Sequence, residues 1–132
     1  MRVSLRFYEW KTISVILFTF LVAGCCMQNQ KSCTRTLSEQ GFLKIAGQVA
    51  RQYSLDLENY HIVYDQDNRQ WEKFLDMLEK HDAKTARDLK NFFRCRCYQA
   101  VLFYPKIPRP GGGFWVFMDT KTGKVLKVLA EV

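Results

Sequence analysis

Residues 111–126 read Gly-Gly-Gly-Phe-Trp-Val-Phe-Met-Asp-Thr-Lys-Thr-Gly-Lys-Val-Leu and contain the clearest structural signal in the sequence. Phe114 to Asp119 is a run of apolar residues closed by an acid, which is typical of a β-strand. A turn follows over residues 120–123, with Gly123 where a left-handed backbone is needed, and residues 124–132 are again strand-like. We therefore predict an antiparallel hairpin at the C-terminal end of the fold.

A third strand is expected before this hairpin. Residues 94–104 alternate in a strand pattern that places Cys95 and Cys97 on the same face as Val101. Three prolines within residues 105–110, followed by three glycines, form a loop that cannot extend the strand. The C-terminal part of the chain is thus predicted to be a three-strand meander.

The preceding segment combines helices with one more strand. Apolar residues recur at three- and four-residue steps over 39–53, which predicts an amphipathic helix beginning near Ser38 or Glu39. Residues 57–65 alternate like a strand that ends in an exposed polar turn at 65–68. Residues 70–93 have helical spacing with an interruption at His81-Asp82, as in one long helix or two shorter ones.

The order of these elements predicts an α+β domain over residues 39–132. Its N-terminal helix is expected to pack on a curved antiparallel sheet that ends in the three-strand meander. A domain of this length buries enough apolar surface to fold alone.

The first 24 residues have a different character. Three cations, Arg2, Arg6 and Lys11, precede an apolar run from Ile13 to Ala23, which is about half the ~20 residues that a transmembrane helix needs. This pattern predicts a signal peptide over residues 1–24.

The end of this segment resembles the lipobox of bacterial lipoproteins. Leu21-Val22-Ala23-Gly24-Cys25 has an apolar residue, two small residues before the cleavage point and the obligatory cysteine. The resemblance implies that Cys25 carries acyl chains such as palmitate, which anchor the chain in a membrane, and that residues 25–38 form a lipidated tether. Lipoproteins with Asp after the cysteine stay in the inner membrane; Cys26 stands here, which implies the outer membrane, facing the periplasm.

Charge adds a second constraint on partners. The whole chain carries +7, but without residues 1–24 it keeps 17 Lys and Arg against 12 Asp and Glu. An exported protein seldom meets nucleic acid, so we expect no nucleic-acid partner. A basic face could still attract lipid head groups, lipopolysaccharide phosphates or an acidic protein.

The remaining cysteines predict a disulfide. In an oxidising compartment we expect a bond from Cys33 to Cys95 or Cys97, because two cysteines two apart on one strand are poorly placed to bridge each other. These three thiols with a histidine could instead hold a metal ion, but His61 and His81 have no ligand-like spacing to them. We expect neither a metal nor another cofactor.

The sequence contains no catalytic signature. The two histidines are predicted to be solvated, and the carboxylates of Asp65 and Asp67 are explained by a turn. The motifs of serine hydrolases, zinc peptidases and phosphate-binding loops are missing from the sequence. We expect no catalytic residues and no enzymatic activity.

The hairpin at 111–126 resembles the terminal hairpin of two families of small exported domains. One is the cystatin-like, nuclear-transport-factor-two-like cone used by some bacterial immunity proteins, and the other is the PepSY domain linked to protease inhibition. The helical run at 71–93 stands where a PepSY-like chain has strands, which favours the cone. The first resemblance implies a helix held in a curved sheet and a protein-binding role.

Four residues are candidates for that role. Trp115 and Phe117 share one face of their strand, beside Lys106 and Arg109, and we expect this face to bind a protein partner. An immunity or inhibitor protein is the leading interpretation. The alternatives are an envelope-maintenance lipoprotein that contacts lipopolysaccharide, peptidoglycan or an assembly machine, and a small-ligand binder with a pocket between the first helix and the sheet.

Overall fold

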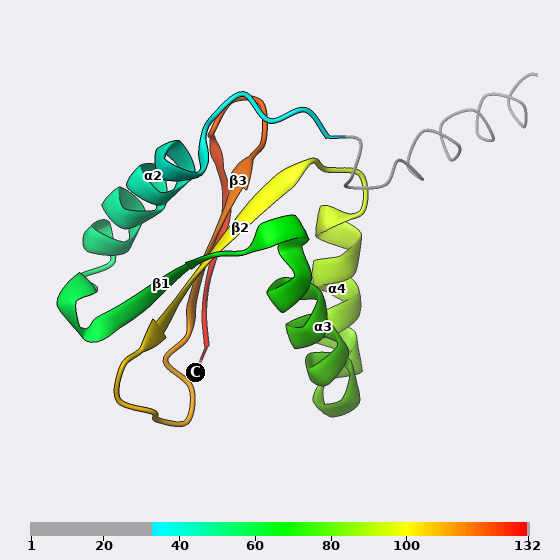
Figure 1. The fold of residues 1–132 in the computed structure, drawn as a ribbon. Helices are drawn as coiled ribbons and strands as arrows, with labels where there is room; N and C mark the ends of the chain where they lie inside the picture. Colours follow the sequence, from blue (N-terminus) through cyan, green and yellow to red (C-terminus); the bar gives the residue numbers. More distant parts are fainter. Residues whose placement is uncertain (1–32, 132) are drawn as a thin grey trace, which may run out of the picture.

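The computed structural model describes residues 33–131. The predicted signal peptide, the lipobox and tether residues 25–32 lie outside the described residues. The elements, labelled in part in Figure 1, are α2 (Glu39–Gln52), η2 (Leu57–Asn59), β1 (Tyr60–Tyr64), η3 (Gln66–Asn68), α3 (Arg69–His81), α4 (Ala83–Phe93), β2 (Tyr98–Pro105), β3 (Phe114–Asp119) and β4 (Val125–Ala130).

The four strands form one antiparallel sheet in the order β1-β2-β3-β4. The hairpin of β3 and β4 turns at Gly123, whose φ is +70° and whose N–H donates to the Asp119 carbonyl over 2.9 Å. The prediction of an α+β fold, with an N-terminal helix on an antiparallel sheet that ends in a three-strand meander, is confirmed.

Helix α2 covers one face of the sheet. Ser38 caps its N-terminus by accepting a hydrogen bond from the Gly41 N–H, and its apolar stripe is buried against β2 and β3. The buried residues of this first core are Phe42, Ala46, Ala50, Val101, Phe103, Phe114, Val116 and Met118. Side chains of α2 and of the sheet thus pack against each other in this interface, where a small-ligand pocket was one of the alternatives.

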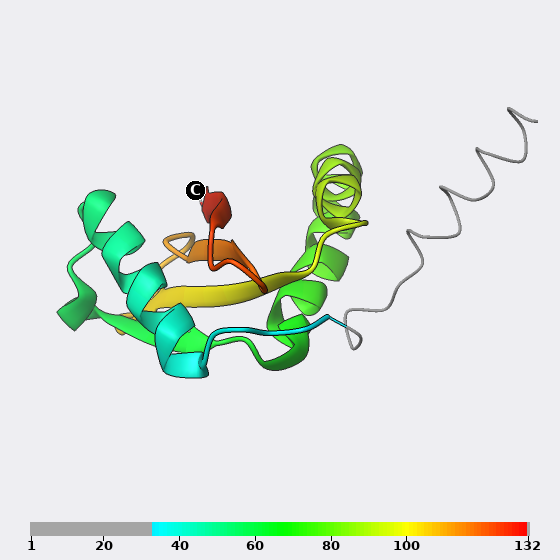
Figure 2. The same ribbon diagram turned by 90° about the horizontal axis from the view of Figure 1, so that it is seen from above.

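The opposite face of the sheet is covered by the antiparallel pair α3 and α4, so that helices lie on both sides (Figure 2). The helical region is two helices, and they separate at Asp82, whose side chain accepts from the Thr85 N–H and caps α4. The buried residues of this second core are Trp71, Leu75, Leu89, Phe93, Tyr98, Ala100, Trp115 and Phe117.

Two boundaries differ from the sequence predictions. Strand β2 begins at Tyr98, so Cys95 and Cys97 lie in the turn after α4 rather than in the strand. The segment 65–68 is only half exposed: Gln66 and Asp67 are exposed as predicted, whereas Asp65 and Asn68 are each only 1% exposed beneath the start of α3. Both differences arise because α3 and α4 fold back onto the sheet.

Candidate functional site

A cleft of about 440 Å³ opens at one end of the sheet, between the turn that follows α2 and the loop that joins β2 to β3. We call it the loop-end cleft. The residues that line it are Ser54, Leu55, Asp56, Asn59, Tyr60, Pro105, Lys106, Ile107 and Arg109. The loop lies at the lower end of the sheet in Figure 1, away from the turn between β3 and β4.

Both sides of the loop-end cleft are joined by hydrogen bonds. The Lys106 N–H donates to the Asn59 carbonyl over 2.9 Å, and Arg109 Nη2 donates to the Tyr60 hydroxyl over 2.8 Å. Gly112 makes the second contact possible, since a Cβ there would lie 2.8 Å from Arg109 Nε and the φ of +91° disfavours other residues. The prolines and these bonds hold the loop in one shape.

The chemical character of the loop-end cleft is cationic beside apolar. Lys106 and Arg109 are exposed, and Ile107 between them is 81% exposed. The carboxylate of Asp56 already accepts bonds from the Glu58 N–H and the Asn59 side chain, so it serves the turn. The arrangement therefore fits a carboxylate that is accompanied by an apolar group.

The structure brings together only two of the four predicted partner-binding residues. Lys106 and Arg109 line one cleft, whereas Trp115 and Phe117 are 2% and 0% exposed beneath α3 and α4. The expected exposed aromatic face is therefore wrong. Trp71 is the residue that covers both rings, with ring centroids 5.3 Å from Trp115 and 4.6 Å from Phe117.

The other end of the sheet holds the predicted disulfide. Cys33 is bonded to Cys97, which confirms one of the two expected pairings. Cys95 is disulfide-bonded as well, and its partner is neither of these two because they pair with each other. Beside the bond, the Thr36 N–H donates to the Thr120 carbonyl, and the Thr120 N–H donates to the Cys97 carbonyl.

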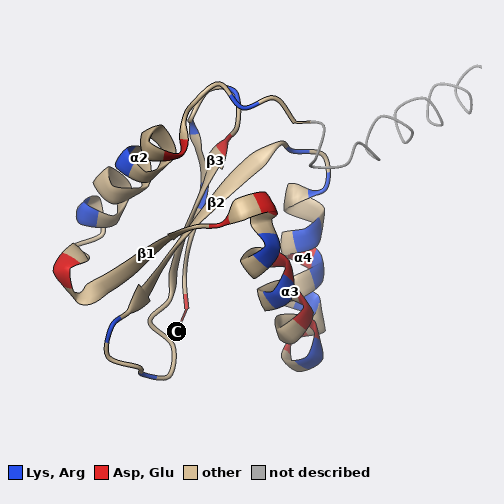
Figure 3. Cartoon of the chain, in the orientation of Figure 1, with Lys and Arg blue, Asp and Glu red and all other residues tan. Residues whose placement is uncertain are grey.

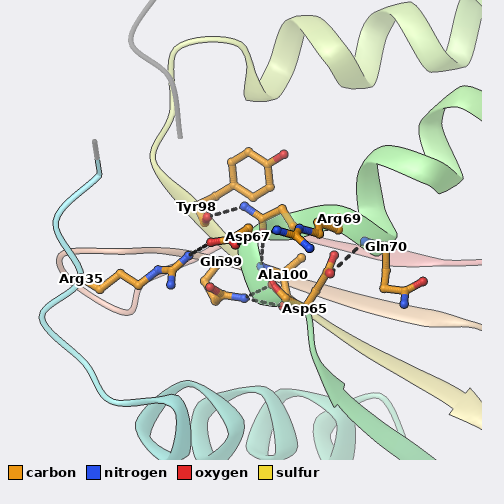
Figure 4. A network of polar contacts seen from close by, with 9 residues as sticks. Arg35, Asp65, Asp67, Arg69, Gln70, Tyr98, Gln99 and Ala100 are labelled. Atoms are coloured by element: carbon orange, nitrogen blue, oxygen red, sulfur yellow. Dashed lines mark hydrogen bonds and ion pairs between the residues drawn. The ribbon is translucent and has the colours of Figure 1, made fainter. Parts of the chain in front are cut away.

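A buried polar network, which the sequence analysis missed, joins α3 to the sheet (Figure 4). The two oxygens of the Asp65 carboxylate accept from the N–H groups of Gln70 and Trp71, at 2.9 and 2.8 Å. The Asn68 side chain donates to the Tyr98 carbonyl and accepts from the Ala100 N–H. The pattern Asp-Gln-Asp-Asn before a helical stripe was the available signal, because such residues cap helices.

This network holds the start of α3 against the sheet. Burial raises the pKa of the Asp65 carboxyl, while the backbone N–H bonds from Gln70 and Trp71 oppose that rise. Asp67 lies outside it, in surface ion pairs with Arg35 and Arg69 at 3.8 and 3.7 Å. Because both Asp65 oxygens are occupied by the first turn of α3, this carboxylate is committed to capping the helix.

Both histidines lie on the surface of the domain. His61 is exposed on β1 with its ring 4.9 Å from that of Tyr104, and His81 is exposed at the end of α3. Within residues 33–131 no group of three His, Cys, Asp or Glu side chains is placed to hold a metal ion. In the same part of the chain no helix has both the length and the apolar character needed to cross a bilayer.

Comparison of the chain with models of protein families, with curated proteins and with solved structures finds no match. Function must therefore be inferred from the chemistry of the loop-end cleft and from the N-terminal sequence.

Proposed function

We propose that the chain is a non-enzymatic, lipid-anchored protein of the bacterial envelope that binds an acidic segment of a protein partner at the loop-end cleft. Facing the periplasm, it would act as an immunity or inhibitor protein. One observation carries the binding proposal. A proline-rich loop, held by the Lys106 and Arg109 hydrogen bonds, presents Ile107, 81% exposed, between two exposed cations and at the edge of a 440 Å³ cleft. Exposing a large apolar side chain costs solvation free energy, and a partner that buries it regains that free energy.

The position of the loop-end cleft supports the same proposal. The disulfide of Cys33 and Cys97 holds the leading segment at the opposite end of the sheet, so a lipid anchor at Cys25 would leave the cleft accessible. The cations explain the choice of an acidic segment, because they steer a carboxylate toward Ile107.

Site-specific photo-crosslinking in whole cells tests this proposal. A benzophenone-bearing residue replaces Ile107 in one variant and Met77, which is 53% exposed on α3, in the matched control. We expect one protein adduct at position 107 and none at position 77. Equal adducts at both positions would contradict a specific site.

Binding to the captured partner, once purified, gives the second measurement. The double variant Lys106→Glu/Arg109→Glu should raise Kd by roughly 10- to 100-fold, because two favourable charges become repulsive. The control Lys73→Glu/Lys80→Glu changes the same number of charges on exposed positions of α3 and should leave Kd within about twofold. An unchanged Kd in the first variant would remove the cleft from the proposal.

The volume of the loop-end cleft favours a small carboxylate-bearing ligand as the second candidate, since pockets for such ligands span about 300–1,000 Å³. Native mass spectrometry of the protein released gently from membranes separates the two. A bound small molecule that is lost in Arg109→Glu would favour the ligand, and a protein complex would favour the leading proposal.

A further inference from the structure

We infer that the end of the domain that carries the Cys33–Cys97 disulfide docks on anionic phospholipid headgroups of the membrane that holds the anchor. We call it the disulfide end. It comprises residues 33–39, the turn at 119–124, and the segments 67–69 and 94–97. The inference rests on the proposed lipid anchor and adds to it the orientation of the domain.

Positive charge is concentrated at the disulfide end. The disulfide end carries six exposed cations against three carboxylates. The cations are Arg35, Arg69, Arg94, Arg96, Lys121 and Lys124, and the carboxylates are Glu39, Asp67 and Asp119. Figure 3 shows Lys and Arg along the leading segment, at the turn between β3 and β4 and at the end of α4.

Elsewhere the charges nearly balance, with a surplus of one cation that comes from Lys44 and Lys127 against Asp65. The opposite end of the sheet, around the loop-end cleft, has three cations and three carboxylates. The cations are Arg51, Lys106 and Arg109, and the carboxylates are Asp56, Glu58 and Glu131. The helical pair between residues 72 and 90 has five of each sign. Most of the surplus positive charge of the described residues is thus gathered at the disulfide end, where it produces a positive field.

The carboxylates of the disulfide end are partly occupied within the chain. Asp67 contacts Arg35 and Arg69, and Asp119 Oδ1 accepts from the N–H groups of Lys121 and Thr122 at 2.9 Å each. Those two N–H bonds and the Thr122 hydroxyl lower the pKa of the Asp119 carboxyl. Lys121 and Lys124 themselves project from an exposed turn, where phosphate groups can reach them.

The length of the tether also limits which end of the domain can approach the membrane. Eight peptide steps separate Cys25 from Cys33 and span at most about 29 Å when fully extended, and a bond from Cys26 to Cys95 would shorten this reach further. Strand β2, which runs from the disulfide end to the loop-end cleft, covers seven steps, or about 23 Å. Placing the cleft against the membrane would need an almost fully stretched tether, which costs conformational entropy. With the disulfide end down, the tether stays relaxed.

Together, these features match what an anionic bilayer recognises. Each Lys or Arg near such a surface adds attraction, and the attraction decays within about one Debye length, so only the end nearest the tether contributes. An acyl anchor keeps the domain close to the membrane and so raises its local concentration there. The cations then determine which face of the domain contacts the headgroups.

The chain's own lysines report the orientation. The acylated full-length protein is reconstituted in vesicles of phosphatidylcholine alone or with phosphatidylglycerol, and a water-soluble amine reagent modifies exposed lysines for readout by mass spectrometry. We expect phosphatidylglycerol to slow the modification of Lys121 and Lys124 at least about threefold while Lys106 changes little. High salt, about 1 M, should remove the difference because it shortens the Debye length to about 3 Å.

Two variants with the same charge change sharpen the result. Arg94→Glu, at the disulfide end, should cut the protection of both lysines, whereas Arg87→Glu, exposed in the middle of α4, should preserve it. The docking would be overturned if each of the three lysines were modified at the same rate in both kinds of vesicle. Protection of Lys106 instead of Lys121 and Lys124 would also overturn it. The mass of the peptide that contains Cys25, measured in the same samples, distinguishes failure of the docking from failure of the anchor. If Cys25 is acylated but the lysines are not protected, only the docking is contradicted. If Cys25 is not acylated, both the anchor and the docking are contradicted.

Discussion

Cys33 and Cys97 are joined by a disulfide whose Cα atoms lie 5.6 Å apart, although the two residues are separated by 64 positions in the sequence. The bond closes a loop that contains α2, β1, α3 and α4, and it attaches the leading segment to the start of β2. Because Cys97 lies directly before Tyr98, a strand residue of the second core, the bond attaches Cys33 to one end of the sheet.

Removal of this bond should weaken the fold substantially. In the chain-entropy model a loop of this length contributes about 4 kcal/mol, and measured effects are often smaller, so Cys33→Ser/Cys97→Ser should lower the free energy of unfolding by about 2–4 kcal/mol. Denaturant unfolding of both proteins measures the difference. A loss below about 1 kcal/mol would show that the bond does little for stability.

The remaining cysteines make a sharp test of the lipid anchor. Cys95 is disulfide-bonded, and Cys33 and Cys97 are unavailable to it, so within one chain only Cys25 and Cys26 can pair with it. Acylation consumes the Cys25 thiol, so we expect non-reducing peptide mapping to find Cys95 linked to Cys26 and acyl chains on Cys25. A bond between Cys95 and Cys25 would contradict the anchor.

Truncation of Phe117 in β3 and truncation of Ile107 in the exposed loop should have different effects: the first on stability, the second on partner binding. Phe117 is fully buried in the second core, so Phe117→Ala should cost about 3–5 kcal/mol in the free energy of unfolding. Ile107→Ala, in contrast, should leave that free energy within about 0.5 kcal/mol and weaken partner binding. Denaturant unfolding curves measure the change in stability. Crosslinking from an uncharged residue of the loop other than position 107 measures the change in partner binding. A strongly destabilising Ile107→Ala would place this side chain in the fold rather than in recognition.

Asp65 should contribute to stability with an unusual pH dependence. Folding raises its carboxyl pKa from the ordinary 3.8, mainly through burial, so the folded state holds this proton more tightly than the unfolded state. Its favourable contribution is therefore full below pH 3.8 and is lost as the pH rises through the raised value. The free energy of unfolding of the wild type minus that of Asp65→Asn should therefore fall as the pH rises above 3.8.

Asp119 supplies the control of opposite sign. Hydrogen bonds from the turn, led by the Thr122 N–H, lower its pKa, so its contribution is present above pH 3.8 and is lost as the pH falls through the lowered value. The free energy of unfolding of the wild type minus that of Asp119→Asn should therefore decrease as the pH falls. Parallel slopes for the two variants would contradict the assignment of Asp65 as a carboxyl with a raised pKa.

Local features of the sequence were sufficient for much of the fold. The hairpin at Gly123, the helix that begins after Ser38 and the interruption at Asp82 each follow from short-range rules of backbone conformation, periodicity and capping. The cations of the loop-end cleft were also recognisable, because prolines and glycines around Lys106 and Arg109 mark an exposed loop.

Local sequence patterns were enough to define the types of element, their order and the possible pairings of the cysteines. Which surfaces remain exposed depends on how these elements pack in three dimensions. Alternation along β3 defines two faces, but nothing local says that α3 and α4 fold back to bury Trp115 and Phe117. The same packing buries Asp65 and places Cys97 rather than Cys95 beside Cys33. The physical reason is that secondary structure depends on neighbours in the chain, whereas burial depends on contacts between segments that are distant in it.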